Sequence, residues 1–334
     1  MKHINVSVFV PHAGCPHQCS FCNQRSISGT KSQPTAQDVR DAALIAMHSS
    51  PERIKDGEIA FFGGSFTAID RDYMIELLSS AQEFIGENGF KGIRISTRPD
   101  AVDGEICDIL EKYHVTAVEL GAQSTNDKVL AMNRRGHTRE DIFRSARLLK
   151  ERGFELGLQM MTGLYGSNDE DSIGTARDII SLSPDTARIY PTVVIENTEL
   201  AELYRNGEYR PQTPEEAVLC AKILPMFERA GIKVIRLGLH SGGDVEGSFV
   251  AGAYHPALRE MCEGHIYFDI INKALSGKEK GKYIIYVAPR EVSKASGQRR
   301  CNIEKLRELG YECRIKENAA LSARDITLEK VNLL

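Results

Sequence analysis

The sequence lacks the long apolar run that a membrane-spanning helix needs. No stretch of about 18 apolar residues occurs, although 42% of the 334 residues are hydrophobic, as in ordinary globular proteins. The opening MKHINVSVFVP is too short and too polar for a secretory signal peptide. Tryptophan is absent as well, which by itself excludes nothing. We therefore expect a cytoplasmic protein with no membrane partner.

Cysteine is sparse except in one short loop. Cys15, Cys19 and Cys22 stand in Cys-x3-Cys-x2-Cys spacing, directly after an apolar run that predicts a strand. The other five cysteines are scattered through predicted helices and strands, and we interpret them as reduced thiols. The chain has no second cysteine cluster, so neither a closed zinc site with two ligand pairs nor an auxiliary iron–sulfur centre is expected.

Three thiolates from one loop suit a cubane iron–sulfur cluster with one open iron, because a fourth cysteine would close it. A structural zinc ion is the alternative, with His12 or His17 as the fourth ligand. We favour the cluster, since a closed zinc site normally draws a second ligand pair from further along the chain. With Phe21 before the third cysteine, the spacing resembles the cluster loop of the radical S-adenosylmethionine (radical SAM) enzymes.

Strand-like and helix-like segments alternate along the first two thirds of the chain, which predicts a parallel sheet with helical crossovers. The predicted strands are 5–11, 58–63, 92–97, 116–122, 154–161 and 186–193, with a seventh at 233–237. The predicted helices are 36–49, 72–87, 103–113, 138–152, 171–183 and 214–230. This pattern favours an α/β fold, a partial (β/α)6 TIM-like barrel. Functional residues of such barrels gather at the carboxyl ends of the strands, where the cysteine loop and several glycine-rich or polar loops would lie.

Longer motifs strengthen and narrow the resemblance. They are GGSFT at 63–67, STRPDAV at 96–102, VELGAQS at 118–124, NRRGHT at 133–138, ARIYPTVVIENTEL at 187–200 and LYRNGEYRP at 203–211. Together they resemble the radical SAM domain of the Elongator catalytic subunit and its bacterial relatives, from about residue 5 to 240. A looser resemblance is to oxygen-independent coproporphyrinogen oxidases.

The resemblance implies cofactors and roles for particular residues. The cofactors are a [4Fe-4S] cluster, ligated by the three loop cysteines, and S-adenosylmethionine, which the cluster would cleave reductively to a 5′-deoxyadenosyl radical. Gly63, Gly64 and Ser65 would receive the methionine amino group. The other implied cofactor contacts are Thr97 and Arg98 near the ribose, Gln123 and Arg135 at the ribose and carboxylate, and Gln159 beside the adenosyl group with Tyr190 nearby.

Structural roles remain open for several of these residues. A surface ion pair is the alternative for Arg98 and Arg135, and a satisfied buried polar group is the alternative for Gln159 and Tyr190. Two departures from Elongator limit the resemblance. The cysteine loop is shorter, and the stretch after residue 240 is too short for the acetyltransferase domain, so the Elongator reaction itself is not implied.

The charge pattern sets the end of the chain apart. Residues 265–334 carry 14 Lys and Arg against 9 Asp and Glu, whereas the chain as a whole has a net charge of −4. We divide the chain into a barrel at 1–240, a connector at 241–264 and a small basic α/β segment at 265–334. In the last segment a strand, helix, turn, helix and strand resemble a KH-like module, with the basic turn Gly297, Gln298, Arg299 and Arg300 in place of the loop that clamps RNA.

These observations favour a radical SAM enzyme that modifies a base of tRNA or ribosomal RNA. It would draw electrons from an external donor of the flavodoxin or ferredoxin type. Two alternatives stay open: radical SAM chemistry on a small molecule or peptide with a structural C-terminal segment, and a non-enzymatic RNA-binding protein with a structural metal site.

Overall fold

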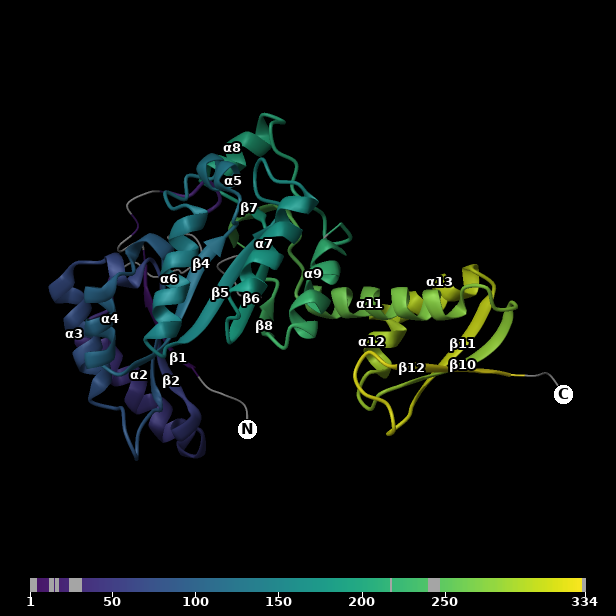
Figure 1. Cartoon of the computed structure of the whole chain (residues 1–334), viewed down its shortest axis with the longest axis horizontal. Helices are drawn as coiled ribbons and strands as arrows, with labels where there is room; N and C mark the ends of the chain where they lie inside the picture. The colour runs from purple at the N-terminus through teal and green to yellow at the C-terminus, as the bar shows by residue number, and fades with distance from the viewer. Residues whose placement is uncertain are drawn as a thin grey trace.

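The computed structural model describes residues 5–11, 15, 18–23, 32–216, 218–239 and 247–331. Its main element is a seven-stranded, all-parallel sheet in the order β1-β2-β3-β4-β5-β6-β8 (Figure 1). The strands are β1 Asn5–Val10, β2 Glu58–Gly63, β3 Gly92–Thr97, β4 Val115–Gln123, β5 Glu155–Thr162, β6 Thr186–Pro191 and β8 Lys233–Leu237. The sheet curls into a half-barrel, which confirms the predicted partial barrel.

Helices on the outer face connect successive strands. They are α2 Ala36–Ser49, α3 Arg71–Gln82, α4 Gly104–Lys112, α6 Arg139–Glu151, α7 Asp169–Ser181 and α9 Val218–Arg229. Local sequence explains where several of them begin: Thr35, Thr138 and Asn168 each cap a helix in a capping box with an aspartate three residues later. The 3-10 turns Pro51–Asp56, Phe66–Ala68 and Pro99–Ala101, and the short helices α5 Asp127–Met132 and α8 Glu199–Arg205, complete the connections.

The two faces of the sheet differ in polarity. Along β3, Ile93 and Ile95 pack in the main hydrophobic core, while Arg94 between them points to the opposite face. The same alternation in β6 places Ala187 and Ile189 in that core and leaves Arg188 for the other face. The concave interior of the half-barrel is therefore polar, and its outer face carries the apolar packing.

A buried ion-pair network crosses this interior. Arg94 lies 2.7 Å from Glu58, 2.6 Å from Glu155 and 3.5 Å from Glu119, and Arg188 lies 2.7 Å from Glu119. The five residues come from five adjacent strands, β2 to β6. Because a charge taken out of water is costly unless it is paired, each member depends on the others.

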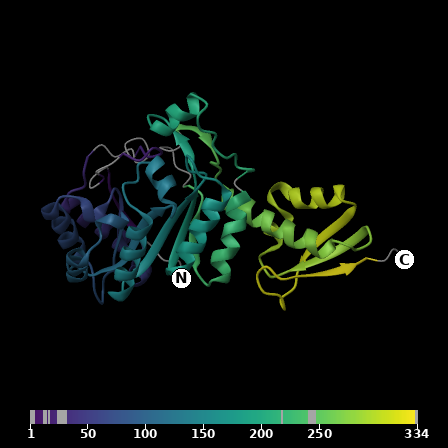
Figure 2. The same cartoon turned by 45° about the horizontal axis from the view of Figure 1, so that its top comes forward.

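A small lobe follows the barrel along one long helix, and Figures 1 and 2 both show it standing beside the half-barrel. Its strands β10 Gly281–Val287, β11 Tyr311–Glu317 and β12 Ile326–Lys330 pair in the order β11-β10-β12. The helices are α11 Leu258–Leu275, α12 Val292–Ser296 and α13 Cys301–Glu308, with a 3-10 turn at Gln298–Arg300. The predicted order of strand, helix, turn, helix and strand is present.

Helix α11 joins the two parts because it belongs to both hydrophobic cores. Leu258 and Cys262 pack in the main core. Tyr267, Ile271 and Leu275 pack in the small core with residues of the three-stranded sheet. The helix is continuous across position 264, where the sequence analysis ends the connector.

Several elements differ from the sequence-based expectation. The segment 186–193 is divided, because β7 Val193–Ile195 leaves the main sheet and pairs with β9 Phe249–Gly252. The helix expected at 72–87 ends at Gln82, and the one expected at 214–230 has its helical part at Val218–Arg229. Helices α5, α8 and α11 and strand β12 have no counterpart among the predicted elements. None of the helices in the described ranges is both long and apolar enough to cross a membrane.

Replacing Arg94 tests how far the fold depends on the interior network. Arg94→Met keeps an unbranched aliphatic stem but removes the charge, which leaves the fully buried Glu58 without its closest cation. We expect the free energy of unfolding, measured by urea denaturation, to fall by about 3–5 kcal/mol. Arg71→Met, which breaks the exposed pair with Glu105, is the control and should cost at most about 1 kcal/mol. Equal losses in the two variants would contradict the role given to the network.

Candidate active site

Buried polar residues gather where β1 to β6 end. All five are buried: Ser65 follows β2, Thr97 and Arg98 lie at the end of β3, and Gln123 and Arg135 end and follow β4. Parallel strands bring their carboxyl ends to one edge of the sheet, so residues far apart in sequence meet there. The cysteine loop, which follows β1, lies at the same edge.

The cysteine loop is anchored from two directions. Ser20 is fully buried, and its hydroxyl donates to Asn133 Oδ1 at 2.8 Å. The Asn133 amide in turn donates to the carbonyls of Val129 and Tyr165. The Leu200 amide donates to the Ser20 carbonyl at 2.8 Å. Asn133 begins the NRRGHT motif, so one motif both holds the loop and supplies the neighbouring Arg135.

Arg135 connects the cysteine loop to the sheet. Its Nη1 lies 3.1 Å from the sulfur of Cys19, and its Nη2 donates to the Gly121 carbonyl at 2.7 Å. Its Nε is buried and has no hydrogen-bond partner among the residues that the structure describes. A side chain at Gly121 would fill this space, because a Cβ there would lie 3.4 Å from Arg135 Nη2 and 3.0 Å from Gln123 Nε2. Two arms of the guanidinium are therefore fixed while one donor remains for a ligand.

Arg98 adds a second positive charge beside the cysteines. Its guanidinium makes two 2.9 Å bonds to Asp100, and its Nη2 also donates to the Arg135 carbonyl at 2.8 Å. Burial lowers the pKa of Arg98, but the pair with Asp100 outweighs burial and raises it, and the nearby Cys19 and Cys15 act in the same direction. Arg98 is thus a buried cation engaged in positioning Arg135.

The loop cysteines differ in their surroundings. Cys19 is buried, Cys22 is half-buried and Cys15 is exposed, with the Cys15 sulfur 3.9 Å from Ser65 Oγ. The Cys22 amide donates to the Cys19 carbonyl at 3.1 Å, which closes a tight turn around Phe21. The Phe21 ring packs against a small apolar cluster that includes Val194 and Leu200.

The end of β2 approaches β1 too closely for a side chain. Gly63 has a φ of 117°, and a Cβ there would lie 2.6 Å from the Val10 carbonyl oxygen. That carbonyl accepts the Gly64 amide at 2.9 Å. Thr97, at the end of β3, shares a 2.6 Å hydrogen bond with Thr67. These contacts fix the backbone of the GGSFT motif against the neighbouring strands.

Two further pairs line the interior below the loop. Gln159 Nε2 donates to Gln123 Oε1 at 3.1 Å, and Gln123 itself has a φ of 65°, a conformation that non-glycine residues seldom adopt. The Tyr190 hydroxyl accepts from Arg188 Nη1 at 3.2 Å. Gln159 and Tyr190 are half-buried, so part of each side chain still faces open space.

His137 lies behind Arg135 and is uncharged at neutral pH. Burial and the charge of Arg135 lower its pKa to about 4. The neutral ring places a proton on Nε2, which donates to the Ala122 carbonyl at 3.2 Å. His137 therefore adds no third charge to the two arginines.

Comparison with known proteins accounts for this arrangement. Residues 9–179 match the family model described as the radical SAM superfamily, and residues 184–267 match the radical SAM C-terminal domain. The chain belongs to the radical SAM superfamily. It is thus a superfamily enzyme, and the match covers the cysteine loop and all the strands that carry the polar residues described above.

Several of the similar proteins are named tRNA uridine(34) acetyltransferase or Elongator complex protein 3. The chain is 28% identical over 252 residues to a tRNA uridine(34) acetyltransferase of Methanocaldococcus infernus, covering 64% of this chain and 47% of that protein. It is 32% identical over 197 residues to Elongator complex protein 3 of Homo sapiens, covering 51% and 35%. The solved structure of archaeal M. infernus Elp3 shares the fold, with a TM-score of 0.62, 22% identity and coverage of 82% and 63%. The chain therefore spans about half or less of the length of these two curated relatives.

The superfamily implies an iron–sulfur cluster and S-adenosylmethionine, and the residues present fit both. Cysteine sulfurs are the ligands of such clusters, and the Arg135 guanidinium lies 3.1 Å from the sulfur of Cys19. The unpartnered Arg135 Nε and the side-chain-free space at Gly121 suit an anionic or polar cofactor group. Among the described residues, no three His, Cys, Asp and Glu side chains already converge in a metal-binding arrangement. His12 and His17, the possible zinc ligands, lie outside the described residues.

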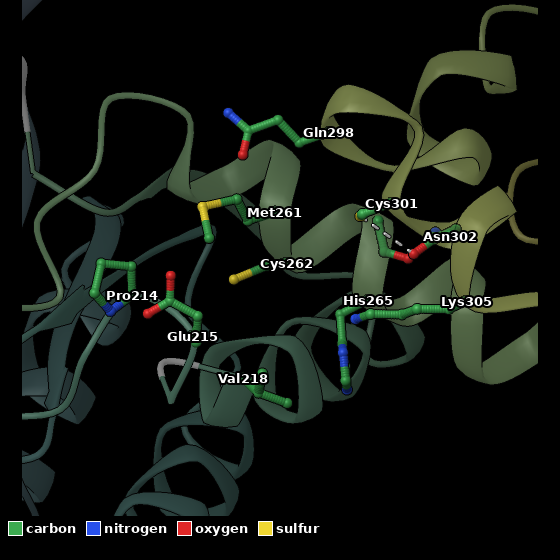
Figure 3. A pocket seen from close by; sticks show the side chains of 11 residues that line it. Pro214, Glu215, Val218, Met261, Cys262, His265, Gln298, Cys301, Asn302 and Lys305 are labelled. Carbon is green, nitrogen blue, oxygen red and sulfur yellow. Dashed lines mark hydrogen bonds between the residues drawn. The ribbon is translucent and has the colours of Figure 1, made fainter. Parts of the chain in front are cut away.

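The predicted RNA turn lies in the small lobe, not beside the cysteines. Arg299 and Arg300 are exposed and both have positive φ angles, 51° and 65°, while Gly297 is buried. Gln298 lines a hollow of about 280 Å³ between α11, the start of α9 and the start of α13 (Figure 3). His265 and Lys305 also line it. The turn and this hollow are neighbours at the junction of the two cores.

The sequence analysis missed the residues that support the site from behind. Asn133 and His137 belong to the NRRGHT motif, and that motif could have been read for loop anchoring as well as for Arg135. Arg188 and Glu119 carry a detectable signal too, because a charge in the middle of a predicted strand must face a polar interior or pair when buried. Their ion pair depends on strand register, so it could be identified only from the structure.

Proposed function

We propose that the chain is a radical SAM enzyme with a [4Fe-4S] cluster on Cys15, Cys19 and Cys22 that modifies a base of tRNA or another RNA. The observation that carries this proposal is Arg135, held by the Gly121 carbonyl, in contact with Cys19, and with a buried donor still free. One guanidinium there spans the cysteine loop and the polar interior, so it can orient a cofactor between them.

Bound cluster and cofactor would supply the chemistry, a one-electron cleavage of S-adenosylmethionine that yields a 5′-deoxyadenosyl radical. The residues of the chain bind, orient and shield. Arg98 fixes Arg135 through its carbonyl. Gln123 and Gln159 form a polar wall beneath the loop, and Tyr190 is held by Arg188. The electron would come from an external donor of the flavodoxin or ferredoxin type.

RNA as the substrate class is supported by two independent features. Two of the similar proteins are tRNA uridine(34) acetyltransferases by name. The small lobe carries the basic excess, and Arg299 and Arg300 form no ion pair within the described part of the chain. Exposed cations without counter-charges suit phosphate contacts.

The cluster can be tested by metal analysis of protein purified without oxygen. We expect close to four iron and four sulfide per chain, with 5′-deoxyadenosine released from S-adenosylmethionine under dithionite. Cys19→Ala should lose both, whereas Cys301→Ala, a half-buried cysteine of the small lobe, should keep both. Zinc in place of iron, with no release, would reject the proposal in favour of a metal-stapled RNA-binding protein.

The role of Arg135 can be separated from that of the cluster. Arg135→Gln removes the free donor and the charge, so we expect S-adenosylmethionine to bind at least about tenfold more weakly. Equilibrium dialysis measures the affinity, and iron content shows that the cluster remains. Arg134→Gln is the control, because its neighbouring guanidinium is exposed and pairs with Glu199. Unchanged affinity in Arg135→Gln would remove Arg135 from the cofactor site.

The RNA contact can be tested by charge reversal in the small lobe. Arg299→Glu with Arg300→Glu should weaken tRNA binding at least about tenfold at a fixed, moderate salt concentration, because two phosphate contacts become repulsions. Filter binding measures the affinity. Lys222→Glu with Arg229→Glu, two exposed cations on α9, is the control. Equal affinities in wild type and the Arg299/Arg300 variant would favour a small molecule or peptide as the substrate.

A further inference from the structure

A second polar cavity lies at the other end of the half-barrel, where the strands begin. Its volume is about 770 Å³, and its wall includes residues at or near the starts of several strands, among them Asn5 of β1 and Thr186 of β6. Strands β1 and β8 are the two edges of the open sheet, and both line the cavity. The cavity therefore occupies the gap that the incomplete barrel leaves open, at the end away from the cysteine loop.

The wall of this cavity is strongly cationic. Glu155 is the one carboxylate among its lining residues. The cationic lining residues are Lys91, Arg94, Arg188, Lys233, Arg236 and Arg259.

Most of these cations already have counter-charges. Arg94 and Arg188 pair with the buried carboxylates of the interior network, and Lys91 lies 3.6 Å from Glu155. Arg259 lies 3.6 Å from Glu263. Glu155, the carboxylate of the wall, is thus already paired with two of its cations.

Lys233 and Arg236 are the two remaining cations of the cavity wall. Neither forms an ion pair with any residue that the structure describes. Both lie on the edge strand β8 and line the cavity. Two further polar atoms of the wall, Thr186 Oγ1 and Asn5 Oδ1, are buried without a hydrogen-bond partner among the described residues. Thr186 is about nine-tenths buried, so it cannot turn to bulk water for a partner.

We propose that this cavity is a binding site for a small phosphate-bearing anion. Two unpaired cations and an unpartnered hydroxyl around one cavity offer what phosphate oxygens accept: charge-assisted hydrogen bonds from a guanidinium and an ammonium, and a neutral donor. The volume exceeds that of a single phosphate and suits a diphosphate or a nucleotide-sized molecule. The site is separate from the cysteine site and does not depend on the proposed function.

The two ends of the barrel are linked through one side chain. Arg188 lines the cavity, pairs with Glu119 and donates to the Tyr190 hydroxyl on the side of the cysteine loop. An anion in the cavity would compete with Glu119 and Tyr190 for the same guanidinium. The anion site is therefore placed to influence the orientation of Tyr190.

Calorimetric titration of the full chain, purified without oxygen, with sodium pyrophosphate tests the proposal. We expect saturable binding of one pyrophosphate per chain that weakens as salt is raised. Lys233→Gln with Arg236→Gln should lower the affinity at least about tenfold, and Thr186→Val should lower it severalfold. Because Lys233 and Arg236 form no ion pair with the described residues, we expect this variant to fold, which circular dichroism will check.

The matched control is Lys222→Gln with Arg229→Gln. These two exposed cations of α9 do not line the cavity, so pyrophosphate binding should be unchanged. Inorganic phosphate and a short single-stranded RNA are the other two titrants. Weaker but saturable phosphate binding, sensitive to the same variant, supports the site. Absence of saturable pyrophosphate binding, equal loss in the two double variants, or binding of RNA alone would each overturn it.

Discussion

Five charged side chains from five neighbouring strands share the interior of the half-barrel, and both of its ends depend on how they pair. Arg94 on β3 pairs with Glu58 of β2 and Glu155 of β5, and Arg188 on β6 pairs with Glu119 of β4. A closed barrel can fill its centre with branched apolar side chains. This chain keeps a polar interior instead, and buried charges are tolerable there because each one has a partner within hydrogen-bonding distance.

The same network separates two sites of different character. Toward the carboxyl ends, Arg188 holds Tyr190, and above it Arg98 and Arg135 bring two fixed positive charges to the cysteine loop. Toward the amino ends, the network pairs with Glu155, while Lys233 and Arg236 form no ion pair within the described part of the chain. A cation with a fixed partner positions its neighbours, whereas a cation without one is available to a ligand. The contrast between Arg98, bound twice to Asp100, and Arg135, with one free donor, follows the same rule within one site.

Helix α11 packs in both hydrophobic cores and so connects the small lobe to the barrel. Its first turns complete the main core and its last turns form the small one, so the lobe is docked by apolar packing instead of hanging on a flexible tether. The basic turn at Arg299 and Arg300 is thus carried on a lobe that is packed onto the barrel through this helix. An RNA bound there would have a defined approach to the barrel, which is what modification of one base requires.

The sequence by itself determined the sheet, its parallel order and the location of the cysteine loop. Alternating helix and strand patterns, capping residues such as Thr35 and Thr138, and Cys-x3-Cys-x2-Cys spacing are all local signals. Individual tertiary contacts could not be predicted from such local signals. Asn133 anchoring Ser20, and Arg135 reaching Cys19, join residues more than a hundred positions apart.

The unexpected elements show the same limit. β7 pairs with β9, which follows it by more than fifty residues, and its short apolar run looked like the end of the preceding strand. The long α11 has a glycine in its middle and no side-chain cap at its start, so local signals for it are weak. Which charges in the barrel are paired and which are left over was decided only by tertiary structure, because strand register and the curl of the sheet determine which side chains face one another.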